Sequence, residues 1–412
     1  MAGGAVTAGG PRPDPGGSDR SRGFGEWLLG VLLDRAHGMP PQLIAPVIAQ
    51  EVARAGGRDL SILLQDYEQL LLVPLPGATV GEPEPIDGSP AGTAFLQADA
   101  VEIARADGVR VYLPLLDGSD QVGVMALTLD TVVDDDRLLL RRVATLVAVI
   151  LAAKHRYTDE FVQARRREQM SVAAEIQWSL LPPLAMSVPR VSVAGVLEPA
   201  YNVAGDSFDY ALNDDILHLA VIDAMGHGLA AAAMATVAIG AYRHARRSGI
   251  SLSGIYAFMD RAIAEQFGPE HFVTAQMMRL NIATGRLQWV NAGHPAPLLI
   301  RDHQVVRQLH SPTTLPVGFG GDEPRLSELT LRAGDRVLCF TDGLIEEHEP
   351  GGEQFGQEQL IAWVNRIEHT EEGVRAVVRS LSRTLMQQRG GITSDDATLF
   401  LIEWRGNDTD PP

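Results

Sequence analysis

The chain has 412 residues, with 34 Lys and Arg against 52 Asp and Glu, which gives a formal net charge of −18 at pH 7. This length predicts two or three domains rather than one small binding module, and an acidic chain without a long basic run argues against nucleic acid as a partner. The single cysteine, Cys339, excludes an internal disulfide framework and a cysteine-ligated zinc site. The longest charge-free apolar stretch near the middle, residues 143–153, falls short of the ~20 residues that span a bilayer. We therefore expect a globular, cytoplasmic protein that does not enter a membrane.

Residues 1–22 are mostly Gly, Pro, Ser and charged residues, with little to bury, so we expect a disordered arm. A secretion signal would need an apolar core after a basic start, and three prolines occupy that place, at Pro11, Pro13 and Pro15. The sequence does not indicate secretion.

Residues 23–154 are predicted to form a small mixed domain in the order helix, strands, helix. Helical spacing at 25–36 and 43–55 precedes strand-like runs at 60–66, 69–75, 109–116 and 121–129, and a further helix is expected at 137–153. Asp117-Gly118 is a hairpin turn signal between the last two runs. The three acids at 134–136 could suggest a metal site, but acids in the first turn favour a helix N-terminus and explain them better.

This arrangement, with the stretch IDGSPAGTAFLQADAVEI, resembles a GAF sensor domain. The resemblance implies that the first domain receives a signal from a small molecule or a protein and regulates the rest of the chain.

Residues 155–184 are charged and contain no Gly or Pro before Pro182. Apolar residues at Val172, Ile176 and Leu180 are four apart, so they fall on one helical face. We expect a linking helix, continuous with the last helix of the first domain and ended by Pro182-Pro183. Its apolar stripe would be buried against the following domain, against a second copy of the helix in a homodimer, or both. This makes the segment a candidate switch.

Residues 185–405 alternate short strands with two helix pairs, and 406–412 form a tail. The expected strands lie close together in sequence, which favours antiparallel sheets. Helix pairs beside antiparallel sheets predict an α+β layered domain. The expected strands are 191–197, 216–223, 272–282, 285–292, 297–301, 305–309, 336–342 and 397–404, and the expected helices are 229–247, 252–267, 358–369 and 373–388.

Four aspartates stand where these strands begin or end, and a surface charge does not explain them well. They are Asp206, Asp223, Asp342 and Asp395. One Asp-Gly at a strand end is usually a turn, but several half-buried carboxylates that converge would repel one another unless a divalent cation neutralised them. Oxygen ligands without a Cys or His cluster favour Mg²⁺ or Mn²⁺.

The motifs VAGDSFD, DAMGHG, NAGHPAPLL, FTDGLIE and SDDATL follow the helix EIQWSLLPP in this order. They resemble the SpoIIE-type bacterial branch of the metal-dependent PPM serine/threonine phosphatases, the group of the RsbU stress phosphatases, over residues 165–404. The resemblance implies a PPM phosphatase fold, with two antiparallel sheets packed face to face, helices on both sides and two Mg²⁺ or Mn²⁺ ions at one end.

The resemblance also implies roles for individual residues. The bridging acid, which is central to catalysis because it contacts both metals, matches Asp223, and the neighbouring main-chain carbonyl matches Ala224. The other implied metal ligands are Asp206, Asp342 and Asp395, with Asp209 and Asp396 as supporting acids. Ala204 departs from the family pattern, which usually has glycine there.

Two histidines, His227 and His294, are tempting as general acids, but a turn residue that hydrogen-bonds locally is the favoured interpretation of both. Cys339 lies inside an apolar run and is expected to be inert core.

These observations predict a protein phosphatase that hydrolyses phosphoserine or phosphothreonine on a regulatory protein. By resemblance, the usual substrates are phosphorylated STAS-domain anti-anti-sigma proteins. One alternative is a catalytically silent scaffold or sensor that uses the fold to bind partners, although such a protein would have no reason to keep four mutually repelling acids. A metal-dependent phosphodiesterase or nucleotidase is disfavoured because no nucleotide-binding motif is recognisable.

Overall fold

The structure is a computed structural model that describes residues 22–75, 81–118, 120–201, 205–312, 314–321, 323–345, 356–369, 373–388 and 396–406. The chain divides into two compact units, Met1–Arg167 and Glu168–Pro412. The predicted arm, almost all of the predicted tail and Asp395 lie outside the described residues. None of the described helices is long and apolar enough to cross a membrane.

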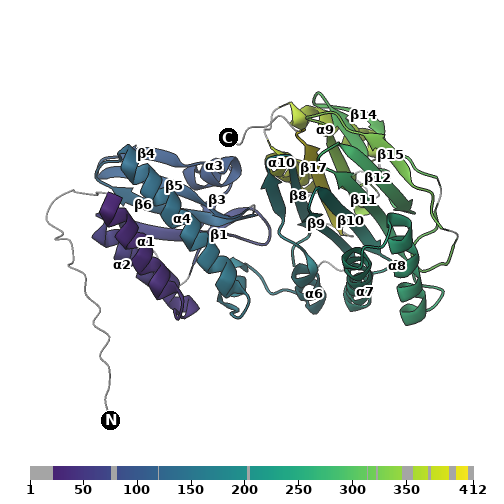
Figure 1. Ribbon diagram of the computed structural model, residues 1–412, viewed down its shortest axis with the longest axis horizontal. Helices are drawn as coiled ribbons and strands as arrows, with labels where there is room; N and C mark the ends of the chain where they lie inside the picture. The colour runs from purple at the N-terminus through teal and green to yellow at the C-terminus, as the bar shows by residue number, and fades with distance from the viewer. Residues whose placement is uncertain are drawn as a thin grey trace, which may run out of the picture. The chain divides into compact units, whose positions relative to one another are not determined.

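The first unit is built on one antiparallel six-stranded sheet in the order β3-β2-β1-β6-β5-β4 (Figure 1). The three longest strands, β1, β6 and β5, are adjacent at its centre, and shorter strands lie on both sides of them. The bounds are β1 Arg58–Gln65, β2 Leu71–Pro74, β3 Glu84–Pro85, β4 Val101–Arg105, β5 Gly108–Asp117 and β6 Asp120–Leu129.

Helices cover both faces of this sheet. Three helices, α1 Arg22–Ala36, α2 Ile44–Arg54 and α4 Asp134–His155, enclose the larger apolar core, and α3 Pro90–Gln97 encloses the smaller one. A short 3-10 turn, Pro41–Leu43, precedes α2. The Asp136 carboxylate accepts a hydrogen bond from the Val133 backbone N–H at 3.1 Å, so the acids at the start of α4 act at a helix N-terminus, as predicted. The predicted helices and strands are present, but α3, β3 and β4, which lie among the strands, were not predicted, and the GAF resemblance stays a prediction.

The predicted continuous linking helix is wrong. The chain forms three separate helices here: α4, which ends at His155, α5 Glu160–Arg165 and α6 Val172–Leu180. Local side-chain hydrogen bonds explain the breaks: the Ser171 hydroxyl caps α6, and the Thr158 hydroxyl accepts the Glu160 backbone N–H at the start of α5. In the sequence, the boundary between the two compact units lies between Arg167 and Glu168, after α5 and before α6.

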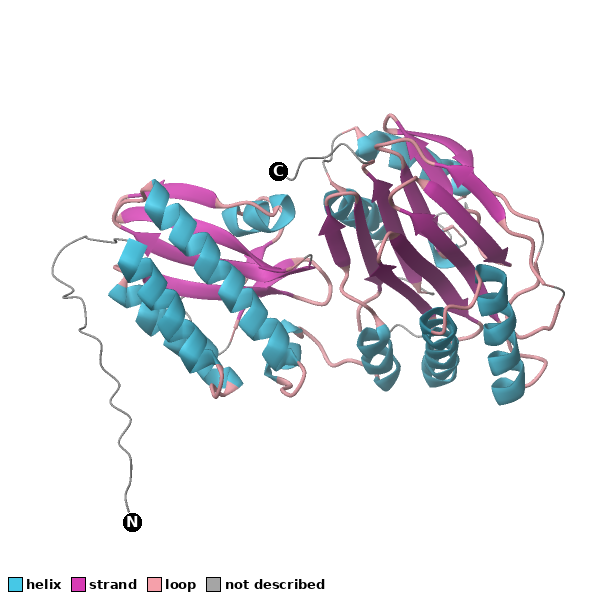
Figure 2. Cartoon of the chain, viewed as in Figure 1, coloured by secondary structure: helices cyan, strands magenta, loops and turns pink. Residues whose placement is uncertain are grey.

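The second unit contains two antiparallel sheets (Figures 1 and 2). One has five strands in the order β15-β12-β11-β10-β9, and the other has six in the order β14-β13-β16-β17-β8-β7. The bounds are β7 Ala185–Val188, β8 Val191–Glu198, β9 Asp206–Asn213, β10 Ile216–Ala224, β11 Val273–Asn281, β12 Arg286–Ala292, β13 Leu298–Arg301, β14 Gln304–Gln308, β15 Ser327–Thr330, β16 Arg336–Phe340 and β17 Ala397–Trp404.

Three apolar layers hold this unit together. Residues from both sheets form the central layer, which contains Cys339 as an inert, buried side chain whose thiol pKa is raised by burial. The helices α7 Gly228–Arg247 and α8 Leu252–Phe267 cover the five-stranded sheet, and α9 Gln357–Glu368 and α10 Val374–Gln388 cover the six-stranded sheet. The α+β layered fold class is confirmed.

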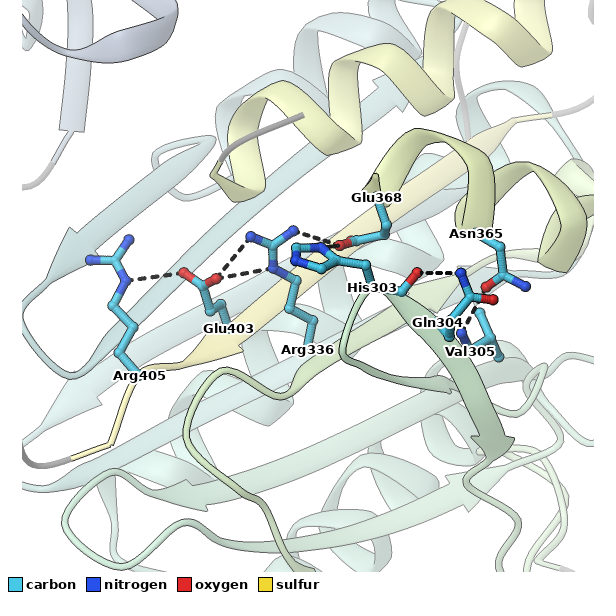
Figure 3. A network of polar contacts seen from close by, with 8 residues as sticks. All are labelled: His303, Gln304, Val305, Arg336, Asn365, Glu368, Glu403 and Arg405. Atoms are coloured by element: carbon cyan, nitrogen blue, oxygen red, sulfur yellow. Dashed lines mark hydrogen bonds and ion pairs between the residues drawn. The ribbon is translucent and has the colours of Figure 1, made fainter. Parts of the chain in front are cut away.

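A polar network fixes α9 to the six-stranded sheet (Figure 3). The buried Arg336 guanidinium lies between Glu403 of β17, at 2.9 Å, and Glu368 at the end of α9, at 2.7 Å. Asn365 of α9 accepts the Val305 backbone N–H of β14 at 2.7 Å. Burial raises the pKa of Glu368, and Arg336 opposes that shift. These contacts set the position of α9 along the sheet.

The helix α6 packs on α7 through Ala173 and Ala232. Its buried residues are Ala173, Ala174 and Gln177, whereas Val172 is 66% exposed and Ile176 is only partly buried. The predicted stripe is therefore not buried as a whole within this unit, because the buried face of α6 is turned by about one residue from it.

Candidate metal centre

Two predicted ligands face each other at one edge of the five-stranded sheet. Asp206 is the first residue of β9, and it pairs directly with Asp223, next to last in the antiparallel strand β10. Directly opposite residues in a sheet have Cβ atoms about 4.5–5.5 Å apart and point to the same face. The Asp206 side chain is buried and Asp223 is half-buried. The neighbours Phe208 and Val221 on these strands belong to the layer between the sheets, so both carboxylates lie at the edge of that layer.

The six-stranded sheet contacts the Asp206 carboxylate through Thr341. This residue follows β16, and its hydroxyl donates to Asp206 Oδ2 at 2.6 Å. The Thr398 backbone N–H of β17 donates to the Thr341 hydroxyl at 2.8 Å, which orients it. Asp342 comes next and opens a short 3-10 turn, Asp342–Leu344. The structure thus brings the chain at Asp342 to the edge that carries Asp206 and Asp223.

Asp396, just before β17, contacts the backbone at the start of β9. Its carboxylate accepts the Gly205 backbone N–H at 2.6 Å and lies 3.4 Å from the Asp206 nitrogen. A Cβ atom at Gly205 would lie 2.8 Å from the Ala224 carbonyl oxygen and 3.6 Å from Asp223 Oδ1. A side chain there would fill the space beside the predicted carbonyl and carboxylate ligands, whereas glycine leaves that space free.

The electrostatics fit a site for cations. The pKa of Asp206 is raised well above its usual value, first by burial and then by repulsion from Asp223 and Asp396, while the Thr341 hydroxyl opposes the shift. The two charged groups that act on Asp206 most strongly are thus both carboxylates. A divalent cation would relieve that repulsion, and the oxygen donors present suit Mg²⁺ or Mn²⁺. Within the described ranges no three His, Cys, Asp or Glu side chains are grouped closely enough to hold an ion, and the predicted ligand Asp395 lies outside them.

Asp209 has a different place from the one expected. It is three residues from Asp206 on β9 and therefore faces the opposite side of the sheet. There it forms ion pairs with Arg243 at 2.7 Å and Arg246 at 2.6 Å, both on α7. Asp209 connects β9 to α7 and does not support a metal ligand.

The two histidines differ from each other. His227 is exposed at the start of α7 and makes no side-chain cap. His294 is buried, with Nδ1 at 2.8 Å from the Thr274 hydroxyl, and its main chain exchanges hydrogen bonds of 2.7 and 2.8 Å with the Asn291 amide. Burial lowers the pKa of His294 to about 3, against a smaller opposing effect of the Phe340 carbonyl. His294 is thus neutral near pH 7 and cannot serve as an imidazolium acid there.

Sequence reasoning missed two residues at this edge, Thr341 and Gln177. The Gln177 amide of α6 donates a hydrogen bond to the Asp206 carbonyl, and Gln177 is almost fully buried. Gln177, a polar residue on the buried face of a short helix, could have indicated this contact. The predicted apolar stripe at 172, 176 and 180 placed the buried face of the helix one residue away from it.

The chain has identifiable relatives. Residues 213–405 match the family described as Stage II sporulation protein E (SpoIIE), a span that includes Asp223 and Asp342 but begins after Asp206. Most of the C-terminal unit is therefore similar in sequence to SpoIIE-type proteins.

The chain is also similar to individual proteins. The chain is 27% identical over 187 residues to phosphoserine phosphatase RsbP of Bacillus subtilis, covering 44% of this chain and 46% of RsbP. It is 20% identical over 264 residues to phosphoserine phosphatase RsbU of the same organism, covering 63% and 77%. A crystal structure of the RsbU and RsbW domains of Rv1364c from Mycobacterium tuberculosis is similar with a TM-score of 0.46 and 29% identity, over 53% of this chain and 61% of that chain. The chain thus spans about half of RsbP and about three quarters of RsbU.

Proposed function

We propose that the C-terminal unit is a metal-dependent serine/threonine protein phosphatase that uses two Mn²⁺ or Mg²⁺ ions. The observation that carries the proposal is the buried Asp206 carboxylate, which faces Asp223 across β9 and β10 and is held by a hydroxyl from the opposite sheet. The proposed ligands are Asp206, Asp223, the Ala224 carbonyl, Asp342 and Asp395.

The chain's own groups would prepare this site. Bound divalent cations would supply a nucleophile from water at neutral pH and neutralise charge on the phosphoryl group. Thr341 fixes the direction of the Asp206 carboxylate, and Asp396 holds the backbone at Gly205 in the turn that faces the Ala224 carbonyl. Burial of Asp206 keeps one side of the site away from solvent. A catalytically silent scaffold would gain nothing from this costly arrangement of carboxylates.

Phosphate release from a phosphoserine peptide tests the proposal. The full chain with added Mn²⁺ should release phosphate and should stop when EDTA is added. Asp223→Asn and Asp342→Asn should each lose most of the activity, whereas Asp302→Asn should not. Asp302 is a matched control because it makes the same chemical change at an exposed turn. Full activity in EDTA, or in Asp223→Asn, would contradict the proposal.

We further propose that the substrate is a phosphorylated STAS-domain protein and that the N-terminal unit regulates its hydrolysis. Two relatives named as phosphoserine phosphatases support a phosphoprotein substrate. The proposed route for regulation is supported by α6, the first helix after the unit boundary, which contacts the Asp206 main chain through Gln177. The exposed Val172 leaves apolar surface on α6 for a second copy of the chain.

Ile176→Asp tests this regulatory route. It should change the rate of phosphate release without touching a proposed ligand, and light scattering should show a dimer in the parent protein. A monomeric parent together with an unchanged rate in Ile176→Asp would remove α6 from regulation.

A further inference from the structure

A pocket of about 370 Å³ opens in the second unit, and no role has yet been given to it. Its lining is polar but contains no Lys, Arg, Asp or Glu among the described residues that form it. Among the polar side chains around it are those of Asn291, His294, Gln308, His310, Thr314 and Gln357. Its volume lies near the lower end of the ~300–1,000 Å³ that ligand pockets usually have.

This pocket lies at the same edge of the sheets as the proposed metal ligands. His294 lines it and contacts Thr274, and Thr274 is paired directly with Asp223 across β10 and β11. Only one strand spacing and one hydrogen bond therefore separate the pocket wall from Asp223.

The six-stranded sheet supplies the opposite wall. Gln308 ends β14 and pairs with Leu298 at the start of β13, and Leu298 pairs with Leu338 in the middle of β16. The chain then runs from β16 to Asp342. The pocket is thus bounded by both sheets at the edge that also carries the carboxylates.

The walls of the pocket are held in place before any ligand binds. The Asn291 amide fixes the turn at His294 through two hydrogen bonds. Gln357 begins α9, whose other end is anchored to the six-stranded sheet by Glu368 and Asn365 (Figure 3). A preformed site loses less free energy to ordering when a ligand binds.

We infer that this pocket binds the polypeptide next to the phosphorylated residue of the substrate and selects uncharged polar side chains there. The inference rests on the proposed phosphatase function and specifies its substrate class. Amide, hydroxyl and imidazole groups can donate to and accept from main-chain amides and polar side chains. Among the described residues this lining offers no Asp, Glu, Lys or Arg to compensate a charged side chain for its lost hydration, and an aliphatic side chain would leave the polar lining unpaired.

The test compares two tryptophan substitutions on β14. Gln308→Trp places a large side chain in the pocket, and Val306→Trp places the same side chain on the same strand, at a 49% exposed position that does not line the pocket. Each protein is assayed with Mn²⁺ on p-nitrophenyl phosphate and on three phosphoserine peptides, whose flanking residues are Ser/Asn/Gln, Lys/Arg or Leu/Val.

The parent protein should show its lowest KM with the Ser/Asn/Gln peptide. Gln308→Trp should raise that KM about 10-fold and abolish the preference, while its kcat/KM on p-nitrophenyl phosphate stays within about twofold of the parent. Val306→Trp should resemble the parent on all four substrates.

Other outcomes overturn the inference in distinguishable ways. If the parent hydrolyses the peptides but prefers charged or aliphatic flanks, or if Gln308→Trp keeps the parent's KM values, the pocket assignment fails and the phosphatase proposal stands. An equal loss on p-nitrophenyl phosphate in Gln308→Trp would place the pocket in catalysis or folding rather than in peptide selection. A parent that hydrolyses no substrate would overturn both proposals.

Discussion

Neutralising either of two aspartates on β9 should have opposite effects on the stability of the metal-free protein. Asp209 is almost fully buried and is paired with Arg243 and Arg246, so Asp209→Asn leaves two cations with a neutral partner. Removing one member of a buried ion pair costs ~3–5 kcal/mol. Because Arg243 is 25% exposed, we expect the lower end, about 3 kcal/mol. At roughly 2–4 °C per kcal/mol for a unit of this size, the melting temperature should fall by about 6–12 °C.

Asp206→Asn should do the reverse. The folded-state pKa of Asp206 is raised, so the metal-free folded protein holds its proton more tightly than the unfolded chain does. The penalty from this carboxylate is absent below the unfolded pKa of about 4, grows as the pH rises, and is complete above the folded pKa. Asp206→Asn should therefore raise the melting temperature at pH 7, and the gain should shrink toward pH 4.

Thermal unfolding of parent and variants in EDTA, followed by circular dichroism at pH 4, 5, 6 and 7, measures both effects. Asp302→Asn, at an exposed turn, controls for the amide substitution itself. A lower melting temperature for Asp206→Asn at pH 7, or an unchanged one for Asp209→Asn, would refute the reasoning that separates the two residues.

Three further predictions concern the same edge of the sheets. Mn²⁺ at 100 times its Kd should stabilise the parent by about 2.7 kcal/mol in thermal unfolding, and Asp223→Asn should lose most of that gain. Gly343→Ala should destabilise the protein by ~1–3 kcal/mol or more and weaken Mn²⁺ binding in calorimetry, because its Cβ would lie 1.8 Å from the Asp396 carbonyl oxygen; unchanged binding would contradict the close approach. Burial lowers the pKa of His294 to about 3 in the folded protein, below the value of about 6.5 in the unfolded chain. The contribution of the neutral imidazole to the free energy of unfolding is therefore complete above pH 6.5 and declines by about 3 kcal/mol on acidification to pH 4. The difference in melting temperature between the parent and His294→Gln should therefore narrow from pH 7 to pH 4, and a constant difference would count against a neutral buried imidazole.

Much of the fold could be predicted because its elements carry clear local patterns. The runs at 216–223 and 397–404 become the central strands β10 and β17, since their apolar residues fill layers on both sides of the sheets. The strand β9 was not predicted as a strand. Two of its residues are buried carboxylates, and the groups that compensate Asp209 come from α7. A local pattern cannot show partners that are distant in the sequence.

The site was predictable in part for the same reason. The position of Asp223 at the end of a strand could be read from the sequence, and Asp206 was recognised from its motif, but their antiparallel pairing across β9 and β10 came only from the structure. The separate roles of Asp209 and Asp396 could not be read, because they depend on which face each side chain takes and on which backbone it meets. The breaks before α5 and α6 were also missed, since backbone hydrogen bonds to the Thr158 and Ser171 hydroxyls outweighed a charged, proline-free stretch that favours a continuous helix.

The position of β17 has a consequence for synthesis of the protein. This strand is the last one in the described chain, yet it lies inside the six-stranded sheet, between β16 and β8. Asp396, at its start, accepts the Gly205 backbone N–H from a point 191 residues earlier. Contacts between residues so far apart in the sequence form slowly, because the entropy cost of closing the loop comes before the contacts stabilise the fold. A ribosome-bound chain therefore holds Asp206 and Asp223 without this support until β17 has emerged, and only then can the carboxylate edge be completed.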